Sequence, residues 1–301
     1  MPNAAAPEGR IIAAHGRHYT VELPDGSLRK CFPRGKKAGA TVGDYVVISP
    51  QGADEGSIDR ILERRNLLYR SDDMRTKQFA ANVDQLLIVV APEPAFSDDL
   101  TGRALVAAWS AGIEPIVVLN KVDLENSIGM ARQRLATLMQ LGIHIVELSA
   151  HAPEQMRAAL LPLLRDRCTL LLGQSGMGKS TILNALVPDA RAHTQEHSQA
   201  LGAGKHTTTS TRLYHLPDQP GDIIDSPGFQ AFGLYHLTAT DIERGFPEFT
   251  EAIQHCRFYN CTHRHEPGCG VLAAIESGAI TTARHELYKR ILAENEAQGR
   301  Y

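Results

Sequence analysis

The sequence lacks any run of about 18 apolar residues, the length that a membrane-spanning helix requires, so we predict no membrane partner. The stretch from Met1 to Arg10 has neither a charged start nor an apolar core, and we therefore read no secretion signal and expect a cytoplasmic protein. Only 5 cysteines occur in 301 residues. In a protein without a signal sequence they should be mostly reduced, which argues against a disulfide framework.

Strong charge of either sign is also missing, since the formal net charge is −3. This balance argues against a uniformly basic coat for nucleic acid. Between Gly9 and Lys77, however, Lys and Arg outnumber Asp and Glu, which indicates either an ordinary solvated surface or a weak RNA-facing patch. The hydrophobic share of 43% and the charged share of 22% are typical of a globular protein with two domains or three small ones.

A glycine-rich stretch from Gly173 to Thr181 matches the phosphate-binding loop pattern, in which two glycines separated by four residues precede Lys and Ser. It follows an apolar strand, Cys168 to Leu172, and precedes a short helix that Pro188 stops. The alternative, a glycine-rich turn without function, does not account for this context. We predict that backbone N–H groups of the loop surround the phosphates of a nucleoside triphosphate. The predicted phosphate-binding residues are Gly173, Gln174, Ser175, Gly176, Met177, Gly178, Lys179, Ser180 and Thr181, with Lys179 neutralising the outer phosphates and Ser180 holding Mg²⁺.

Short alternating strands separated by turns occupy the first part of the chain and predict a small five-stranded β-barrel of the oligonucleotide-binding (OB) kind over residues 8–75. The expected strands are Arg10 to Ala14, His18 to Leu23, Leu28 to Phe32, Asp44 to Ser49 and Gly56 to Arg65. The region from Ser71 to Asn82 is polar and reads as a linker.

Unbroken apolar strands alternating with helices follow, which is the pattern of a parallel sheet covered on both faces. We predict this α/β domain over residues 79–236, with Ser97 capping its first helix. Residues 237–301 become helical and polar, with helices expected from Thr240 to His255 and from Thr281 to Glu296. They are predicted to form a third, metal-binding domain.

Two motifs at predicted strand ends suit a guanine base. The first comprises Asn120, Lys121 and Asp123, and the second Ser149 and Ala150. The Asp123 carboxylate can accept hydrogen bonds from the N1–H and 2-amino groups of guanine, whereas adenine would face it with a lone pair. Asn120 would serve the other base edge, and Lys121 would pack along the ring and tie back to the phosphate loop. A backbone N–H of Ser149-Ala150 would meet the guanine oxygen. GTP and GDP are therefore the expected ligands.

The stretch that begins at Asp225 and ends at Gly228 completes the nucleotide set. Asp225 would hold a Mg²⁺-bound water, and the Gly228 N–H would sense the γ-phosphate. Upstream of it lies a run of three threonines, of which Thr208 is our first choice for the hydroxyl that closes on Mg²⁺. The alternative for this run is a β-edge, because threonine favours strands.

The order of these motifs along the chain is unusual. An ordinary GTPase runs from phosphate loop to guanine motifs, whereas here Asn120 and Ser149 precede Gly173. Because domain termini often lie close together, a circular permutation keeps the same sheet and moves only the ends. The second switch, after Asp225, then leads directly into the C-terminal residues.

A cluster of cysteines and histidines near the C-terminus has the composition of a closed four-coordinate zinc site: Cys256, Cys261, Cys269 and either His263 or His265. Reduced surface cysteines in a histidine-rich loop are the alternative. With so little core of its own, such a loop would depend on Zn²⁺ to fold.

The permuted motif order, the Ser-Gly-x-Gly-Lys-Ser loop, the His-Thr-Thr-Thr run and this cluster together resemble the ribosome-small-subunit-dependent GTPase A family over nearly the whole chain. The resemblance implies a GTPase that the 30S ribosomal subunit stimulates, acting in late assembly of that subunit, with an OB barrel and a C-terminal zinc domain. It also favours His263 over His265 as the fourth ligand. The implied partners are the 30S subunit and its rRNA, and we expect a monomer.

The residue that positions the attacking water is not the usual one, because Phe229 stands where many small GTPases carry Gln. We predict slow intrinsic hydrolysis and a site that a partner completes. His236 is the first candidate for the catalytic group, ahead of Gln230 and His206, since the second switch can carry its imidazole toward the γ-phosphate. Two other functions stay open, a GTP-gated RNA-binding module with incidental hydrolysis and a GTP-dependent metal chaperone.

Overall fold

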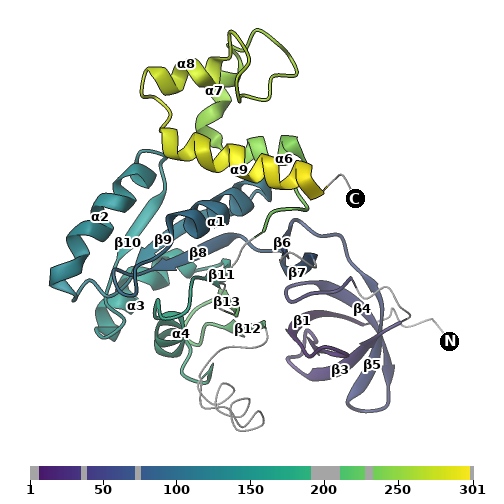
Figure 1. Ribbon diagram of the computed structural model, residues 1–301. Helices are drawn as coiled ribbons and strands as arrows, with labels where there is room; N and C mark the ends of the chain where they lie inside the picture. Colours follow the sequence, from purple (N-terminus) through teal and green to yellow (C-terminus); the bar gives the residue numbers. More distant parts are fainter. Residues whose placement is uncertain (1–6, 35–38, 72–75, 191–210, 228–232, 299–301) are drawn as a thin grey trace.

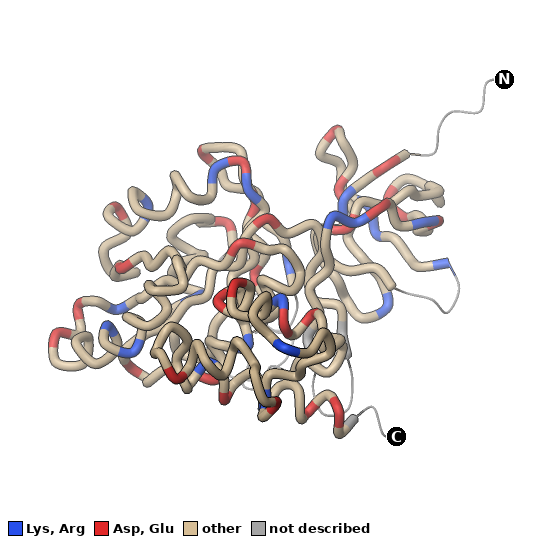
Figure 2. The backbone as a smooth tube through the Cα atoms, turned by 90° about the horizontal axis from the view of Figure 1, so that it is seen from above, with Lys and Arg blue, Asp and Glu red and all other residues tan. Residues whose placement is uncertain are grey.

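The computed structural model of the chain describes residues 7–34, 39–71, 76–190, 211–227 and 233–298. Figure 1 shows an N-terminal β-barrel, a central α/β domain and a group of C-terminal helices that lies across one end of the α/β domain. Basic and acidic residues are interspersed over all three parts, as Figure 2 shows, in keeping with the small net charge. Across the described ranges, no helix has the length and apolar character needed to cross a bilayer.

The barrel has the five predicted strands. They pair in the order β1-β2-β3-β5-β4, and β4 pairs back with β1 to close the barrel. Only the β3–β5 pair is parallel. This order and closure confirm the predicted OB-type barrel. The strand bounds are β1 (Glu8–Ala14), β2 (Tyr19–Glu22), β3 (Leu28–Pro33), β4 (Tyr45–Gln51) and β5 (Glu55–Ile61).

The predicted linker from Ser71 to Asn82 is wrong, because most of it forms a hairpin. Strands β6 (Leu67–Ser71) and β7 (Thr76–Ala81) pair antiparallel and connect the barrel to the α/β domain. Phe79, Ala80 and Ala81 are buried, so the polar composition of the segment conceals a short apolar strand. Asn82 then fixes the end of the hairpin, because its side chain accepts from the Arg65 N–H and donates to the Gly43 carbonyl.

The α/β domain contains the predicted parallel sheet, in the order β10-β9-β8-β11-β13, with β12 antiparallel at the side of β13. Every residue of β8 and β11 is buried, which explains their unbroken apolar sequences. The strands are β8 (Gln85–Val90), β9 (Glu114–Leu119), β10 (His144–Glu147), β11 (Cys168–Leu172), β12 (Arg212–His215) and β13 (Asp222–Asp225).

Within the described part of this domain, four helices accompany these strands (Figure 1). Ser97 caps the first of them as predicted, because its hydroxyl accepts a hydrogen bond from the Leu100 N–H. The helices are α1 (Asp98–Ser110), α2 (Glu125–Met139), α3 (Pro153–Leu164) and α4 (Lys179–Leu186).

The barrel is joined to the α/β domain by strand pairing and by charge. Ala13 of β1 pairs with Arg212 of β12, so the two sheets form one sheet of 11 strands. Asp222 on β13 accepts from Arg10 of the barrel at 2.5 Å and lies 2.7 Å from His215 Nδ1. The other ring nitrogen of His215 lies 2.8 Å from Glu22. The hydrogen bond to Asp222, helped by Glu22, raises the pKa of His215 to about 9.

We predict that the stability contributed by His215 at the junction between the barrel and the α/β domain depends on pH. Its pKa is raised above the ordinary 6.5, so its contribution to stability is full below pH 6.5 and is lost as the pH rises through about 9. We expect His215→Gln to lower the free energy of unfolding by about 1 kcal/mol at pH 6, because solvent screens a half-exposed pair. Urea unfolding of both chains at several pH values measures the difference, which should vanish near pH 10. A difference independent of pH would contradict the assignment, and exposed His144→Gln serves as the control.

The C-terminal part differs from the prediction at its first helix. The single helix expected from Thr240 to His255 is broken after Arg244, because Pro247 cannot continue a helix. Phe246 and Phe249 turn inward there and pack against Tyr288. The elements are α6 (Ala239–Arg244), a 3-10 turn (Pro247–Phe249), α7 (Thr250–Ile253), α8 (Gly270–Glu276), which was not predicted, and α9 (Thr282–Gln298), close to the predicted last helix.

Helix α9 lies across α1 and fixes the C-terminal helices to the α/β domain (Figure 1). Arg103 of α1 donates two hydrogen bonds to the Glu294 carboxylate, at 2.6 and 2.8 Å, although Arg103 is only 8% exposed. Gly102 lies against Leu287, where an added Cβ would come within 2.5 Å of a side-chain carbon. The close approach and the buried ion pair make this a specific contact between the two parts.

Candidate functional site

The predicted nucleotide-binding residues meet at one edge of the parallel sheet. Asn120 follows β9, Ser149 lies just beyond β10, Gly173 follows β11 and Asp225 ends β13. Because these strands are parallel and adjacent, their carboxyl ends lie side by side. This is the edge where open α/β sheets bind ligands.

The conformation of the phosphate loop requires its glycines. Gly176 and Gly178 have φ angles of 82° and 94°, in the left-handed region that side chains disfavour. An added Cβ on Gly178 would come within 2.1 Å of the Asn120 amide nitrogen, and one on Gly173 within 2.5 Å of the Val89 carbonyl oxygen. The loop therefore packs closely against the residues of two neighbouring strands, and Gly173 and Gly178 have no room for a side chain. It leads directly into the N-terminus of α4.

Lys179 opens α4 and is 9% exposed. Its ammonium donates to the carbonyl oxygens of Gly173 and Gln174, at 2.7 and 3.0 Å. Burial lowers the pKa of Lys179, and the nearby Asp225 carboxylate partly opposes this. A phosphate oxygen at the loop would favour the charged ammonium, so Lys179 is suited to bind one.

Asp225 is buried beside the loop, since it pairs in register with Leu171 of β11. Ser226 follows it, and its hydroxyl donates to the Leu171 carbonyl at 2.7 Å. Ser180 is exposed at the start of α4. The other predicted magnesium and switch residues, Thr208 and Gly228, lie outside the described residues.

Asn120 links the phosphate loop to the second guanine motif and is 1% exposed. Its amide nitrogen donates to the Met177 carbonyl in the phosphate loop at 2.8 Å, and its amide oxygen accepts from the Ala150 N–H at 2.9 Å. From the sequence, Asn120 is expected to contact a base edge and a backbone N–H of Ser149-Ala150 to meet the guanine oxygen. In the structure the Ala150 N–H donates to the Asn120 amide oxygen, so a guanine oxygen would have to share this N–H with Asn120.

Asp123 is an ionised acceptor at the exposed end of the site. The Ser149 hydroxyl donates to its carboxylate, and this hydrogen bond lowers the pKa of Asp123. The serine thereby aligns the carboxylate and leaves its remaining lone pairs for another donor. The chemistry at this position is that of a receptor for two neighbouring N–H groups.

A loop that the sequence reasoning missed, 91–97, borders the site. The Ser97 N–H donates to the Gln174 side chain at 2.7 Å, and Pro94 lies beside Gly176. Lys121 donates to the Glu93 carbonyl at 2.6 Å, so it is tied to this loop and not directly to the phosphate loop. The available signal was position alone, because the loop follows β8 at the same sheet edge as the motifs.

His236 lies next to the connecting hairpin. Its ring packs on Tyr69 of β6 with the ring centroids 4.9 Å apart. Burial lowers the pKa of His236, so the imidazole is neutral at neutral pH and able to accept a proton. The two alternative candidates, Gln230 and His206, are outside the described residues.

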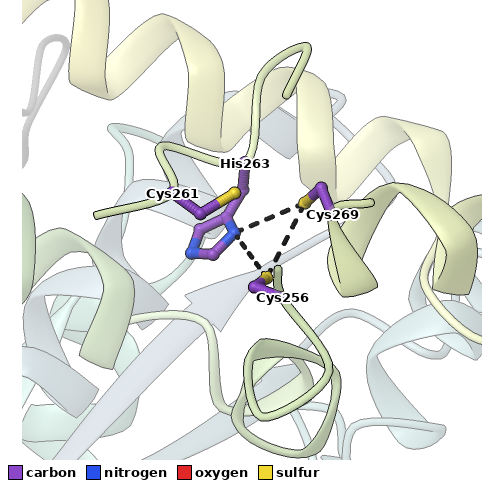
Figure 3. Close-up of side chains that lie close together, drawn as sticks. All are labelled: Cys256, Cys261, His263 and Cys269. Carbon is purple, nitrogen blue, oxygen red and sulfur yellow. Dashed lines mark hydrogen bonds between the residues drawn. The ribbon is translucent and has the colours of Figure 1, made fainter. Parts of the chain in front are cut away.

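Three cysteines and a histidine form a separate cluster between α7 and α8. The ligand atoms of Cys256, Cys261, His263 and Cys269 all lie within 4.8 Å of one another, and Figure 3 shows the four side chains converging. His263 Nδ1 is 3.5 Å from the sulfurs of Cys256 and Cys269, which are 3.9 Å apart. A tetrahedral zinc ion would separate two sulfurs by about 3.8 Å and sulfur from nitrogen by about 3.6 Å. The cluster therefore fits a closed zinc site.

The surroundings of His263 suit a metal ligand. Its second nitrogen, Nε2, lies 3.2 Å from the Glu243 carboxylate, which holds the ring with Nδ1 facing the sulfurs. Its carbonyl accepts from His285 at 2.6 Å. The rival residue, His265, is exposed and is not part of the group.

The fold and the site define a class of protein, a P-loop GTPase whose guanine motifs precede its phosphate loop in the chain. Comparison with known proteins agrees, since the family model described as RsgA GTPase matches residues 61–235. The chain belongs to this family and is a GTP hydrolase.

Relatives match over almost the whole chain. The small ribosomal subunit biogenesis GTPase RsgA of Bordetella pertussis is 67% identical over 294 residues, covering 98% of each chain. The protein of the same name from Burkholderia pseudomallei strain K96243 is 58% identical over 289 residues, covering 95% of this chain and 92% of that one.

Two solved structures share the fold. YjeQ from Thermotoga maritima superposes with a TM-score of 0.73 at 29% identity, covering 96% of this chain and 98% of its own. YloQ, described as a circularly permuted GTPase, gives a TM-score of 0.69 at 28% identity, covering 97% and 96%. The predicted permutation is thereby confirmed.

Proposed function

We propose that this GTPase acts in late assembly of the small ribosomal subunit, with the 30S particle and its rRNA as partners that stimulate hydrolysis. The names of the close relatives support this role. The structure contributes one further observation in its favour, the packing of His236 on the hairpin that leads to the barrel. Such a chain would work in the cytoplasm, as a monomer, with domains at 8–75, 79–236 and 237–301.

Recognition of guanine is assigned to Asp123, aligned by Ser149, with Asn120, Lys121 and Ala150 shaping the rest of the base site. The carboxylate accepts from the N1–H and the 2-amino group together. Adenine offers neither group to this carboxylate, and covering its remaining lone pairs with a base that supplies no donor would cost about 1–3 kcal/mol. The site therefore selects GTP over ATP.

A change at Asp123 provides a sharp test. We expect Asp123→Asn to weaken GTP binding about 100-fold or more, because a charge-assisted bond is lost and an amide N–H faces the 2-amino group. Xanthosine triphosphate carries an oxygen at that position and should gain affinity. Competition binding of the two nucleotides measures both effects. Asp189→Asn, at an exposed carboxylate beyond α4, is the control, and equal losses for both nucleotides would contradict the assignment.

The triphosphate is assigned to the loop from Gly173 to Thr181, with Lys179 on the outer phosphates. Mg²⁺, when bound, would supply positive charge that neutralises the charge developing on the phosphate oxygens. Ser180, Asp225 and Thr208 are proposed to hold it, directly or through water, and the Gly228 N–H to meet the γ-phosphate. Of these residues the structure describes Ser180 in the first turn of α4 and Asp225 at the end of β13, which pairs with the strand that leads into the loop.

The hydrolytic group is proposed to be His236. A neutral imidazole can orient water and accept its proton, and burial keeps His236 neutral. Its contact with Tyr69 ties its position to the connecting hairpin. A partner that moves this hairpin can therefore control whether the imidazole reaches the γ-phosphate, which is how we explain stimulation.

Zn²⁺ is proposed as a structural ion on Cys256, Cys261, His263 and Cys269. It supplies cross-links to a loop that has little core of its own. Four protein ligands, of which His263 and Cys269 are buried, leave no open coordination position for exchange, and this disfavours the alternative role of a metal chaperone.

The decisive experiment is single-turnover GTP hydrolysis alone and with 30S, 50S or 70S particles. We expect stimulation by 30S alone among these. Equal rates with and without 30S would overturn the proposal. Tight association with 30S that follows GTP binding without faster turnover would instead favour the RNA-binding module.

A further inference from the structure

The turn formed by Arg257, Phe258, Tyr259 and Asn260, here called the zinc-loop tip, carries two adjacent exposed aromatic side chains. Tyr259 is fully exposed at 103% and Phe258 is 41% exposed. The other exposed large apolar side chains in the described residues are scattered over the barrel and α2: Leu28, Tyr45, Met130 and Met139. Packing within the chain therefore does not explain this pair.

The zinc-loop tip is held rigidly. It lies between two members of the metal cluster, Cys256 and Cys261. The Arg257 N–H donates to the Gly268 carbonyl at 2.9 Å, and the Cys261 N–H donates to the Phe258 carbonyl at 3.3 Å. The cluster and these bonds fix the backbone on both sides, so the aromatic rings are presented with little entropy to lose on binding.

Charge around the zinc-loop tip favours an anionic partner. No Asp or Glu occurs from Gln254 to His265, although the whole chain has a net charge of −3. The Arg257 guanidinium lies over the Phe258 ring, 5.5 Å from its centroid. Other basic residues of the C-terminal part are used internally, since Arg264, Arg284 and Arg290 pair with Glu296, Glu248 and Asp99. Arg257 makes no such pair among the described residues.

The chemistry of the zinc-loop tip distinguishes between two classes of partner. The same stretch, Gln254 to His265, contains no Leu, Ile, Val or Met, so it lacks the apolar bulk that forms the centre of a protein interface. It offers two aromatic faces, a guanidinium and an amide, which are the groups that stack on and bond to unpaired bases. The loop lies at the outer end of the C-terminal helices, away from the α/β domain (Figure 1).

We propose that the zinc-loop tip binds unpaired RNA by stacking Tyr259 and Phe258 on successive bases while Arg257 faces the phosphate backbone. The inference rests on the proposed RNA partner and assigns the residues and the mode of contact. It also gives the metal cluster a second role, because the cluster orients the rings.

The test uses the full chain and a fluorescent single-stranded RNA 12-mer of mixed sequence, with affinity measured by anisotropy. Tyr259→Ala and Phe258→Ala should each weaken binding about 5- to 100-fold, as expected for one stacked base. Tyr259→Leu, which keeps apolar bulk without a π face, should be as weak as Tyr259→Ala. Tyr259→Trp should bind at least as well as the native chain, with its added fluorescence quenched by the RNA.

Met130→Ala is the matched control, because it removes an exposed apolar side chain from α2. Zinc content measured for each variant verifies that the cluster is intact. Native affinity in both alanine variants would overturn the proposal. Full rescue by Tyr259→Leu would also overturn it, because RNA binding would then depend on apolar bulk and not on stacking. If Tyr259→Ala and Phe258→Ala bind RNA like the native chain and 30S still stimulates their GTP hydrolysis, only the proposal about the zinc-loop tip fails. Absence of stimulation in the native chain would count against the proposed function itself.

Discussion

Replacing His236 with alanine is expected to remove most of the stimulated hydrolysis while leaving GTP affinity unchanged. The imidazole is neutral because burial lowers its pKa, and a positioned general base typically contributes about 10²- to 10⁴-fold. The loss should therefore appear in the rate with 30S present and only weakly in the rate without it. Single-turnover hydrolysis and equilibrium binding of a labelled GTP analogue measure the two quantities.

His144→Ala is the matched control for this experiment. It makes the same change at an exposed position at the start of β10, on the opposite edge of the sheet from the motifs. A stimulated rate for His236→Ala close to that of the native chain would remove His236 from the mechanism. Lower GTP affinity without a change in the bound rate would indicate a role in binding instead.

The zinc cluster should produce the largest effect on stability. We expect Cys256→Ser to abolish tight zinc binding and to unfold α7 and α8, because structural zinc typically contributes about 10–16 kcal/mol of binding free energy. The central domain should still bind GTP, since none of its nucleotide residues lies in that region. Zinc quantification, limited proteolysis and nucleotide binding of the variant measure these outcomes.

His265→Ala is the control for the ligand assignment, because His265 is the exposed rival of His263. It should keep one zinc per chain and resist proteolysis like the native protein. Zinc loss in His265→Ala together with retention in His263→Ala would contradict the assigned ligand set. Full retention of zinc by Cys256→Ser would contradict it as well.

The sequence predicted the central sheet well because its strands are buried on both faces. Strand β11 begins and ends at the predicted residues, Cys168 and Leu172, since a polar motif follows its apolar run directly. The same motifs identified the site edge, because a phosphate loop and two guanine motifs can meet only at the carboxyl ends of neighbouring strands.

Features that depend on tertiary contacts were not predictable in this way. The β6–β7 hairpin was missed because polar residues surround its short buried segment, Phe79 to Ala81. The bridging role of Asn120 depends on the Met177 carbonyl, 57 residues away, which no local pattern reveals. The break after Arg244 is different, because Gly245 and Pro247 signal it locally in the sequence.

The permuted strand order also has a consequence for synthesis of the chain. Strands β8, β9 and β10 leave the ribosome before β11, yet β8 pairs with β11 on its other side. The nascent chain therefore exposes an apolar, unpaired strand edge until the phosphate loop segment emerges, and such edges invite aggregation. Strand β1 remains without its partner β12 for longer still, because β12 is synthesised after β11. We expect the barrel to fold early and alone, and the nucleotide site to form only near the end of translation.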